Sequence, residues 1–319
     1  MMKKIAILTS GGDAPGMNAA IRSIVRIGLH YGMEVYGVID GYRGLIERNL
    51  VKLTHRIVSE KLNSGGTFLG TSRYDEFMDI EVKKKAVENL KEEGIDVLVV
   101  IGGEGTIKGA QTLSTLSLNC IAIPATIDND VAVTDYAIGF DTALNTVVET
   151  IDKLRDTSSS HQRCSIIETM GRNYGELALQ AGIACGAEVV ITPERNYSLD
   201  EVSKMINEGL EKGKKHAIVI VAENILDVKE FAKELGEHIH LPATVTVLGH
   251  VQRGGTPTAF DRVLATRMGS HAIQLILENK YNKIVAIKGN KIVDVDLEKI
   301  KKSETKIPDD LFRITTETE

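Results

Sequence analysis

The chain has 319 residues, of which 43% are hydrophobic and 26% charged, and its formal net charge is −6. The length exceeds the roughly 100–200 residues of a typical domain, so we expect two domains. The acidic balance argues against a protein that coats nucleic acid or binds an anionic membrane.

Cysteine usage and the start of the chain favour a cytoplasmic protein without a membrane or nucleic-acid partner. The three cysteines are widely spaced, with no CxxC pattern, which is typical of reduced packing residues in a reducing compartment. Lys3 and Lys4 lead directly into an apolar run, without the apolar core of a signal peptide. No stretch approaches the ~20 apolar residues that span a membrane.

Short apolar runs alternate with segments of helical period along the chain. The predicted strands are residues 5–8, 97–101, 120–123, 164–167, 189–191, 217–221 and 245–248, and the predicted helices include 18–29 and 83–91. Strands that are apolar throughout are typical of parallel sheets buried on both faces. The alternation predicts an α/β fold of two three-layer α/β/α sandwich domains with mainly parallel sheets. The polar stretch 301–319 is expected to be a surface segment or a partly ordered tail.

Glycine-rich segments follow the first two of these strands, where an α/β sheet binds ligands. Residues 9–18 read TSGGDAPGMN and open a predicted helix, so backbone N–H groups there can approach an anion. There is no GK[ST], and a plain tight turn is the alternative. Residues 102–106 read GGEGT. A carboxylate between glycines suits a hydrated cation beside phosphates.

An acidic segment follows the third strand. Residues 126–130 read TIDND, with Asp128 and Asp130 two positions apart. Such a pair suits general-base catalysis beside a metal ion or a substrate. A turn rich in Asp and Asn is the structural alternative.

Arginines on glycine-flanked segments complete the pattern. Arg163 precedes a predicted strand, Arg172 follows it in the sequence MGR, and Arg253 lies in GHVQRGG at residues 249–255. The guanidinium fork matches phosphate oxygens. Together with two acidic strand ends, these arginines favour phosphoryl transfer, which depends on positioning and charge neutralisation.

These segments together resemble the bacterial ATP-dependent 6-phosphofructokinases, from about Lys4 to about Glu278. TIDND and GHVQRGG are the most specific of them. The resemblance implies a homotetramer that uses MgATP to phosphorylate the C1 hydroxyl of fructose 6-phosphate in glycolysis. It also implies a larger ATP-binding domain at 1–138 plus 251–300, and a smaller sugar-phosphate domain at 139–250 plus 301–319.

The resemblance assigns roles to residues at matching positions. Asp128 is the expected base, Thr126 and Arg172 lie by the transferring group, and Glu104 and Asp130 are the metal ligands. The implied ATP site consists of Gly12, Arg73, Tyr74, Gly103, Glu104, Gly105 and Thr106. The implied sugar-phosphate site consists of Thr126, Ile127, Asp128, Arg163, Met170, Gly171, Arg172, Glu223, Thr244, His250, Val251, Gln252 and Arg253, with Arg163 reaching in from a neighbouring subunit.

A separate effector site is also implied, with ADP as activator or phosphoenolpyruvate as inhibitor in this family. Its residues are Arg22, Arg26, His55, Arg56, Glu60, Arg155, Gly186, Glu188, Lys212, Lys214, Lys215 and His216.

Five positions depart from the family pattern. Glu104 stands for the usual Asp, Val133 for Gly, Thr244 for an Arg that clamps the 6-phosphate, and His55 for an effector-site Arg. Ala125 stands where ATP users have Gly and pyrophosphate users usually Lys; with Gly105 in place of the Asp of pyrophosphate users, it favours ATP. Two further functions therefore remain open: a kinase for another phosphorylated ketose such as a heptulose phosphate, or a weakly active regulatory paralogue that binds nucleotide and phosphometabolites.

Overall fold

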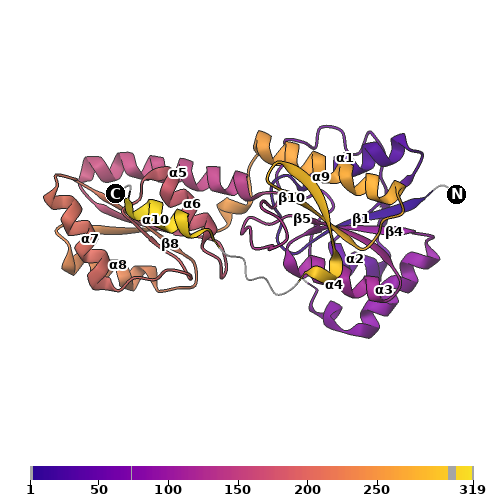
Figure 1. Cartoon of the computed structure of the whole chain (residues 1–319), viewed down its shortest axis with the longest axis horizontal. Coiled ribbons are helices and arrows are strands. Elements are labelled where there is room, and N and C mark those ends of the chain that lie inside the picture. The colour runs from indigo at the N-terminus through magenta and orange to yellow at the C-terminus, as the bar shows by residue number, and fades with distance from the viewer. Residues whose placement is uncertain (1–2, 73, 301–306, 318–319) are drawn as a thin grey trace. The chain divides into compact units, whose positions relative to one another are not determined.

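The computed structural model describes residues 3–72, 74–300 and 307–317, which separate into two compact units (Figure 1). The first unit holds the described residues within Met1–Thr142 and Arg253–Thr305, and the second those within Ala143–Gln252 and Lys306–Glu319. Which unit binds which ligand is not decided by this division and stays a prediction.

The first unit contains a sheet whose described strands follow the order β11-β10-β5-β4-β1-β2-β3. All neighbours are parallel except β10–β11 and β2–β3. The strands are β1 (Lys4–Ser10), β2 (Glu34–Val38), β3 (Leu50–Lys52), β4 (Val97–Gly102), β5 (Asn119–Pro124), β10 (Lys283–Lys288) and β11 (Lys291–Asp296). The helical elements are α1 (Met17–His30), α2 (Gly41–Glu47), η1 (Asp75–Met78), α3 (Ile80–Glu92), α4 (Glu104–Thr115), α9 (Ala259–Leu277) and η3 (Leu297–Lys299).

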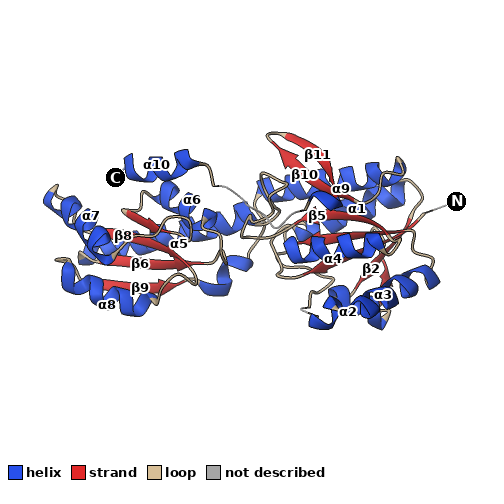
Figure 2. Cartoon of the chain, turned by 60° about the horizontal axis from the view of Figure 1, so that its bottom comes forward, coloured by secondary structure: helices blue, strands red, loops and turns tan. Residues whose placement is uncertain are grey.

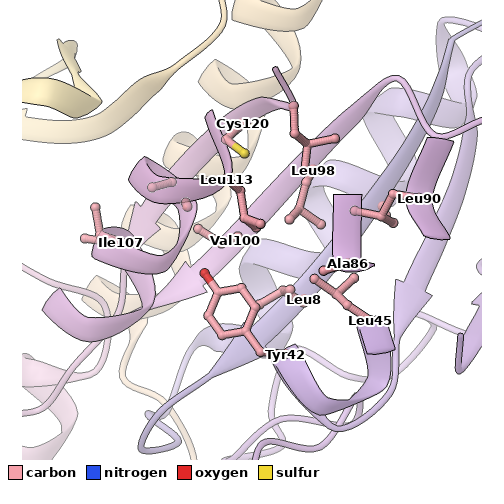
Figure 3. Close-up of a cluster of buried hydrophobic side chains, with 14 of the residues drawn as sticks. Leu8, Tyr42, Leu45, Ala86, Leu90, Leu98, Val100, Ile107, Leu113 and Cys120 are labelled. Carbon is pink, nitrogen blue, oxygen red and sulfur yellow. The ribbon is translucent and has the colours of Figure 1, made fainter. Parts of the chain in front are cut away.

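Alternate residues of the central strands face two helical layers. On one face, Leu8 of β1 and Val100 of β4 pack in a cluster with side chains of α2, α3 and α4 (Figure 3). On the other face, Ile5 of β1 approaches Gly28 of α1, next to Ile273 of α9. Both faces of β1, β4 and β5 are therefore buried, which explains why these strands are apolar throughout.

The second unit contains a parallel sheet whose described strands follow the order β7-β8-β6-β9. Its strands are β6 (Cys164–Thr169), β7 (Val189–Ile191), β8 (Ala217–Ala222) and β9 (Ala243–Val247), and its helices include α6 (Glu176–Cys185), α7 (Leu199–Glu211), α8 (Val228–His238) and α10 (Asp309–Glu317). The chain passes from one unit to the other within two elements, α5 (Phe140–His161) and η2 (Gly249–Arg253). Helices cover both faces of this sheet as well (Figure 2).

The observed elements confirm the predicted fold class, although β2, β3, β10 and β11 were not among the predicted strands. The last predicted strand was expected at residues 245–248, whereas the observed strand β9 covers Ala243–Val247. The polar stretch 301–319 was expected to be a surface segment or tail. Its first six and last two residues lie outside the described residues, but Ile307 is buried and α10 packs on α6.

Candidate active site

The carboxyl ends of three adjacent strands carry the first group of candidate residues. Strands β5, β4 and β1 are neighbours and run parallel, and their register pairs Gly102 with both Ser10 and Pro124. The loops that follow these strands therefore leave the sheet side by side. This edge is where parallel α/β sheets bind ligands.

Two helices begin at this edge on glycine. Gly16 precedes α1 and Gly103 precedes α4, and no side chain caps either helix. By contrast, Asp79 caps α3 and Thr258 caps α9 through side-chain oxygens. First-turn N–H groups without a side-chain acceptor suit the binding of a phosphate.

The first turn of α4 contains Thr106, whose side chain is hydrogen-bonded, and Gly105, which has empty space beside it. Thr106 is buried, and its hydroxyl donates to the carbonyl oxygen of Ser10 over 2.9 Å. The phenol of Tyr42 donates to the carbonyl oxygen of Thr106 over 2.6 Å. A Cβ placed on Gly105 would meet no protein atom within 4 Å. Thr106 therefore anchors α4 to β1, and Gly105 leaves space beside the helix.

Gly12, also expected at the nucleotide, lies in the loop that follows β1. The guanidinium of Arg253 lies against the Cα of Gly12, although the sequence assigned these residues to different ligands. Tyr74 packs partly buried against the core of the first unit. Arg73 lies outside the described residues.

Glu104 lies in the first turn of α4, where its Oε1 is 2.5 Å from Nζ of Lys108, one helical turn later. In the part of the chain that the structure describes, no group of three or more His, Cys, Asp or Glu side chains could hold a metal ion. Mg²⁺ needs only one or two carboxylates where phosphate oxygens supply further ligands. The carboxylates of Glu104 and Asp130 therefore fit an ion that arrives with a nucleotide.

Asp128 lies in a loop whose conformation is stabilised by the side chain of the next residue, Asn129. Asp128 is buried, and its N–H donates to Oγ1 of Thr126 over 3.1 Å. Asn129 adopts a left-handed conformation, with φ of 52°. The Asn129 side chain donates to the carbonyl oxygen of Asp135 and accepts from the N–H of Ala137. No role was predicted for Asn129, although Asn is typical of such turns.

Three more residues of this segment pack into the protein. Ala125 and Ile127 are buried, and the N–H of Ala125 donates to the carbonyl oxygen of Gly102 over 3.0 Å. Val133, at a position where the resemblance implies glycine, packs against the core of the first unit. The Val133 side chain therefore has a place in that core.

The second unit gathers candidate residues at the carboxyl ends of β8, β6 and β9, which are adjacent strands. Residues 170–172 follow β6, Glu223 follows β8, and His250 and Val251 are exposed in η2 after β9. Oε1 of Glu223 accepts from the N–H groups of Gly171 and Arg172.

Arg163 and Thr244 lie near the opposite end of this sheet. Arg163 immediately precedes β6 and is exposed. Thr244 is partly buried on β9, paired with Ser165, and its hydroxyl lies 3.4 Å from the carbonyl oxygen of Cys164. Within this unit, Arg163 and Thr244 therefore lie at the opposite edge of the sheet from Met170 and Arg172.

The implied effector residues fall into one group in each unit. In the first unit, burial and the nearby Arg26 guanidinium lower the pKa of Arg22 on α1. His55, Arg56 and Glu60 are exposed.

In the second unit, the Arg155 guanidinium donates to the carbonyl oxygens of Cys185 and Gly186 and lies 3.4 Å from Nε2 of His216. Glu188 is buried; it forms an ion pair with Lys214 and accepts from the N–H of Ile218. Lys212 and Lys215 are exposed.

Asp261, for which no role was predicted, is a buried carboxylate at the start of α9. Asp261 accepts from the N–H groups of Gly139 and Thr142 and from the Thr142 hydroxyl, over 2.9, 2.8 and 2.5 Å. Burial raises its pKa to about 6 despite these hydrogen bonds. The Asp261 side chain thus connects α9 to the segment that leads into α5. The sequence feature that could have identified Asp261 is the Thr258-x-x-Asp261 spacing, which is typical of a helix start.

Among the helices in the described part of the chain, none combines the length and apolar character needed to cross a membrane.

Comparison with known proteins identifies close relatives. Residues 4–276 match the family model described as Phosphofructokinase. The ATP-dependent 6-phosphofructokinase of Vibrio campbellii is 51% identical over 318 residues, covering 99% of each chain. ATP-dependent 6-phosphofructokinase 1 of Clostridium perfringens is 52% identical over 313 residues, covering 98% of each. The crystal structure of Pichia pastoris phosphofructokinase in the T-state matches at 38% identity with a TM-score of 0.90, over 94% of this chain but only 35% of the yeast chain.

Proposed function

This chain belongs to the phosphofructokinase family, and we propose that it transfers the γ-phosphoryl group of ATP to the C1 hydroxyl of fructose 6-phosphate, giving fructose 1,6-bisphosphate and ADP. One observation carries the proposal: adjacent parallel strands β1, β4 and β5 end in Ser10, Gly102 and Pro124, next to Gly12, Glu104 and Asp128. An anion-binding loop, a metal-binding carboxylate and a general base thus share one edge of a sheet.

Asp128 is the proposed general base. Proton removal from the attacking hydroxyl typically contributes ~10²–10⁴-fold to the rate. The hydrogen bonds of Asn129 to Asp135 and Ala137 hold the loop on which Asp128 lies. Thr126, whose hydroxyl accepts from the N–H of Asp128, and Arg172 are proposed to lie by the transferring group.

ATP is the proposed phosphoryl donor, rather than pyrophosphate. The space beside Gly105 at the uncapped start of α4 leaves room for a nucleotide. Ala125 is buried and carries no charge, where pyrophosphate users usually have Lys. The proposed ATP site is lined by Gly12, Arg73, Tyr74, Gly103, Glu104, Gly105 and Thr106.

Magnesium is proposed to be bound with ATP by the carboxylates of Glu104 and Asp130. The ion neutralises charge on the phosphate oxygens of such a complex. Glu104 forms an ion pair with Lys108. When metal is bound, the Glu104 carboxylate therefore contacts both Lys108 and the ion, or loses its contact with Lys108.

The proposed ligands of the sugar phosphate are among those that the family resemblance assigned. Those in the second unit are Met170, Gly171, Arg172, Glu223, His250 and Val251, and those in the first are Thr126, Ile127 and Arg253. Arg163 and Thr244, at the amino ends of β6 and β9, are proposed to act on sugar phosphate bound by a neighbouring subunit. The position of Arg163 at the amino end of β6 supports a contribution to a neighbouring subunit, as in a homotetramer.

The arginines and lysines of the implied effector groups support the binding of ADP or phosphoenolpyruvate between subunits. We propose that the enzyme works in the cytoplasm, in glycolysis.

A coupled assay with ATP and a panel of sugar phosphates tests the proposal. Turnover that is fastest with fructose 6-phosphate is expected. A higher kcat/KM with a heptulose phosphate would favour the second candidate, a kinase for another ketose, which Thr244 motivates. Binding of ATP and sugar phosphates without turnover would indicate a regulatory paralogue.

A further inference from the structure

The turn after β6 holds two successive residues with positive φ: Gly171 at 149° and Arg172 at 58°. A Cβ on Gly171 would lie 2.4 Å from the carbonyl oxygen of Tyr174, so glycine is needed at that position. The left-handed conformation is unfavourable for a non-glycine residue such as Arg172. A conformation of this kind persists only where surrounding contacts hold it.

Two side chains from other strand ends hold this turn. Oε1 of Gln252 accepts from the N–H of Met170 over 3.1 Å. Oε1 of Glu223 accepts from the N–H groups of Gly171 and Arg172 over 3.2 and 2.8 Å. Three successive backbone N–H groups are therefore held by η2 and by the end of β8.

Gln252 is itself fixed in the protein. Its side chain is fully buried, and its Nε2 donates to the carbonyl oxygen of Gly249 over 3.0 Å. The amide oxygen and the amide nitrogen are thus both engaged with backbone. The main chain of Glu223 is held as well, because its N–H donates to the carbonyl oxygen of Thr169 over 2.8 Å.

We infer that Gln252 is a positioning residue that acts through Arg172, with Glu223 as its partner, and that it does not contact the sugar phosphate. The inference rests on the proposed function, in which Arg172 stabilises the transferring phosphoryl group. Gln252 and Glu223 fix the backbone from which the guanidinium extends. Small displacements of a group that acts on the transition state are costly, on the order of 10²-fold for 1 Å.

Gln252→Met tests the inference, because it keeps the length of the side chain and removes both hydrogen bonds. We expect kcat to fall by roughly 10²-fold, while the KM for fructose 6-phosphate changes by less than about threefold, since an interaction of the transition state alone is lost. A raised KM with unchanged kcat would overturn the inference and make Gln252 a substrate ligand.

A double-mutant cycle with Arg172→Ala separates positioning from a general structural effect. If Gln252 acts through Arg172, Gln252→Met lowers kcat by less than about threefold in the Arg172→Ala background. An undiminished loss in that background would contradict the inference. Gln180→Met is the matched control: Gln180 donates to Glu176 within α6 of the same unit, and this variant is expected to keep its kcat in either background.

Glu223 provides a second test if Gln252→Met does not fold. Glu223→Gln keeps an oxygen acceptor for the two N–H groups, and Glu223→Met removes it. We expect Glu223→Gln to retain at least about tenfold more kcat than Glu223→Met, and equal losses would count against positioning. If the unaltered protein does not phosphorylate fructose 6-phosphate, the proposed function itself fails. An active protein whose variants behave additively refutes the positioning role alone.

Discussion

The guanidinium of Arg253 occupies the space that a side chain on Gly12 would need: a Cβ on Gly12 would lie 1.9 Å from Nη1 and 2.9 Å from Cζ of Arg253. Glycine at position 12 therefore allows an arginine to lie directly on the loop that follows β1. This contact joins the GG pair of the first loop to the QRGG segment, more than two hundred residues later in the chain.

Gly12→Ala is expected to displace Arg253 while the fold persists, because the end of a flexible side chain can move away. We expect the KM for fructose 6-phosphate to rise about tenfold, as for the loss of one charged hydrogen-bonding partner, with a change in unfolding free energy below about 1 kcal/mol. Steady-state kinetics and urea unfolding measure the two effects. In an Arg253→Ala background, the same substitution should change the KM little; a full effect there would mean that Gly12 acts independently of Arg253.

Gly105→Ala is expected to separate stability from nucleotide binding. Its Cβ would meet no protein atom, and alanine is favoured over glycine in a helix by about 0.5–1 kcal/mol. The unfolding free energy should therefore rise while the KM for ATP increases, because the added methyl fills space proposed for the nucleotide. An unchanged KM for ATP would show that the nucleotide lies elsewhere.

Asp128→Ser is expected to lower kcat by ~10²–10⁴-fold, with a much smaller change in the affinity for fructose 6-phosphate. Kinetics together with calorimetric titration of the sugar phosphate check this expectation. Asp135→Asn is a suitable control, since Asp135 lies in the same loop but pairs with Lys288 and Gly289, and kcat should change by less than about threefold. Parallel losses of rate and affinity in Asp128→Ser would assign Asp128 a structural role.

Thr244→Arg introduces the arginine that the family resemblance implies at this position, and we expect it to lower the KM for fructose 6-phosphate by about tenfold. One charge-assisted hydrogen bond is typically worth about 1.5–3 kcal/mol. Thr244→Met has similar length without the charge and should not lower the KM. If neither variant differs from the unaltered protein, the phosphate does not lie near β9.

Asp261→Asn is expected to change how stability depends on pH. The pKa of Asp261 is raised to about 6 in the folded protein, against roughly 3.9 in an unfolded chain. Between these values the folded state binds more protons, so the contribution of Asp261 to stability falls as pH rises through the window. Two pKa units correspond to on the order of 3 kcal/mol.

Urea unfolding of both proteins at pH 4 and pH 7 measures this effect, because other titrating groups are common to both proteins. The unfolding free energy of the unaltered protein minus that of Asp261→Asn should fall from pH 4 to pH 7. A difference that stays constant, or grows with pH, would mean that the Asp261 pKa is not raised.

Local sequence patterns predicted the fold class and identified the loops that follow β1, β4 and β5 as candidates for the site. The residues of β1, β4 and β5 are apolar on both faces, a property that is visible in the sequence because each face packs against helices. The loops containing Gly12, Glu104 and Asp128 were identifiable because glycine and carboxylate residues directly follow those strands.

Only the tertiary structure decided which residues hold others in place. The burial of Asp261 against Gly139, the Gln252 hydrogen bond to Met170 and the contact of Arg253 with Gly12 join segments far apart in the chain. A sequence contains a donor and an acceptor but not the distance between them. That distance depends on strand order and on packing, so these partners could be assigned only once the sheets were formed.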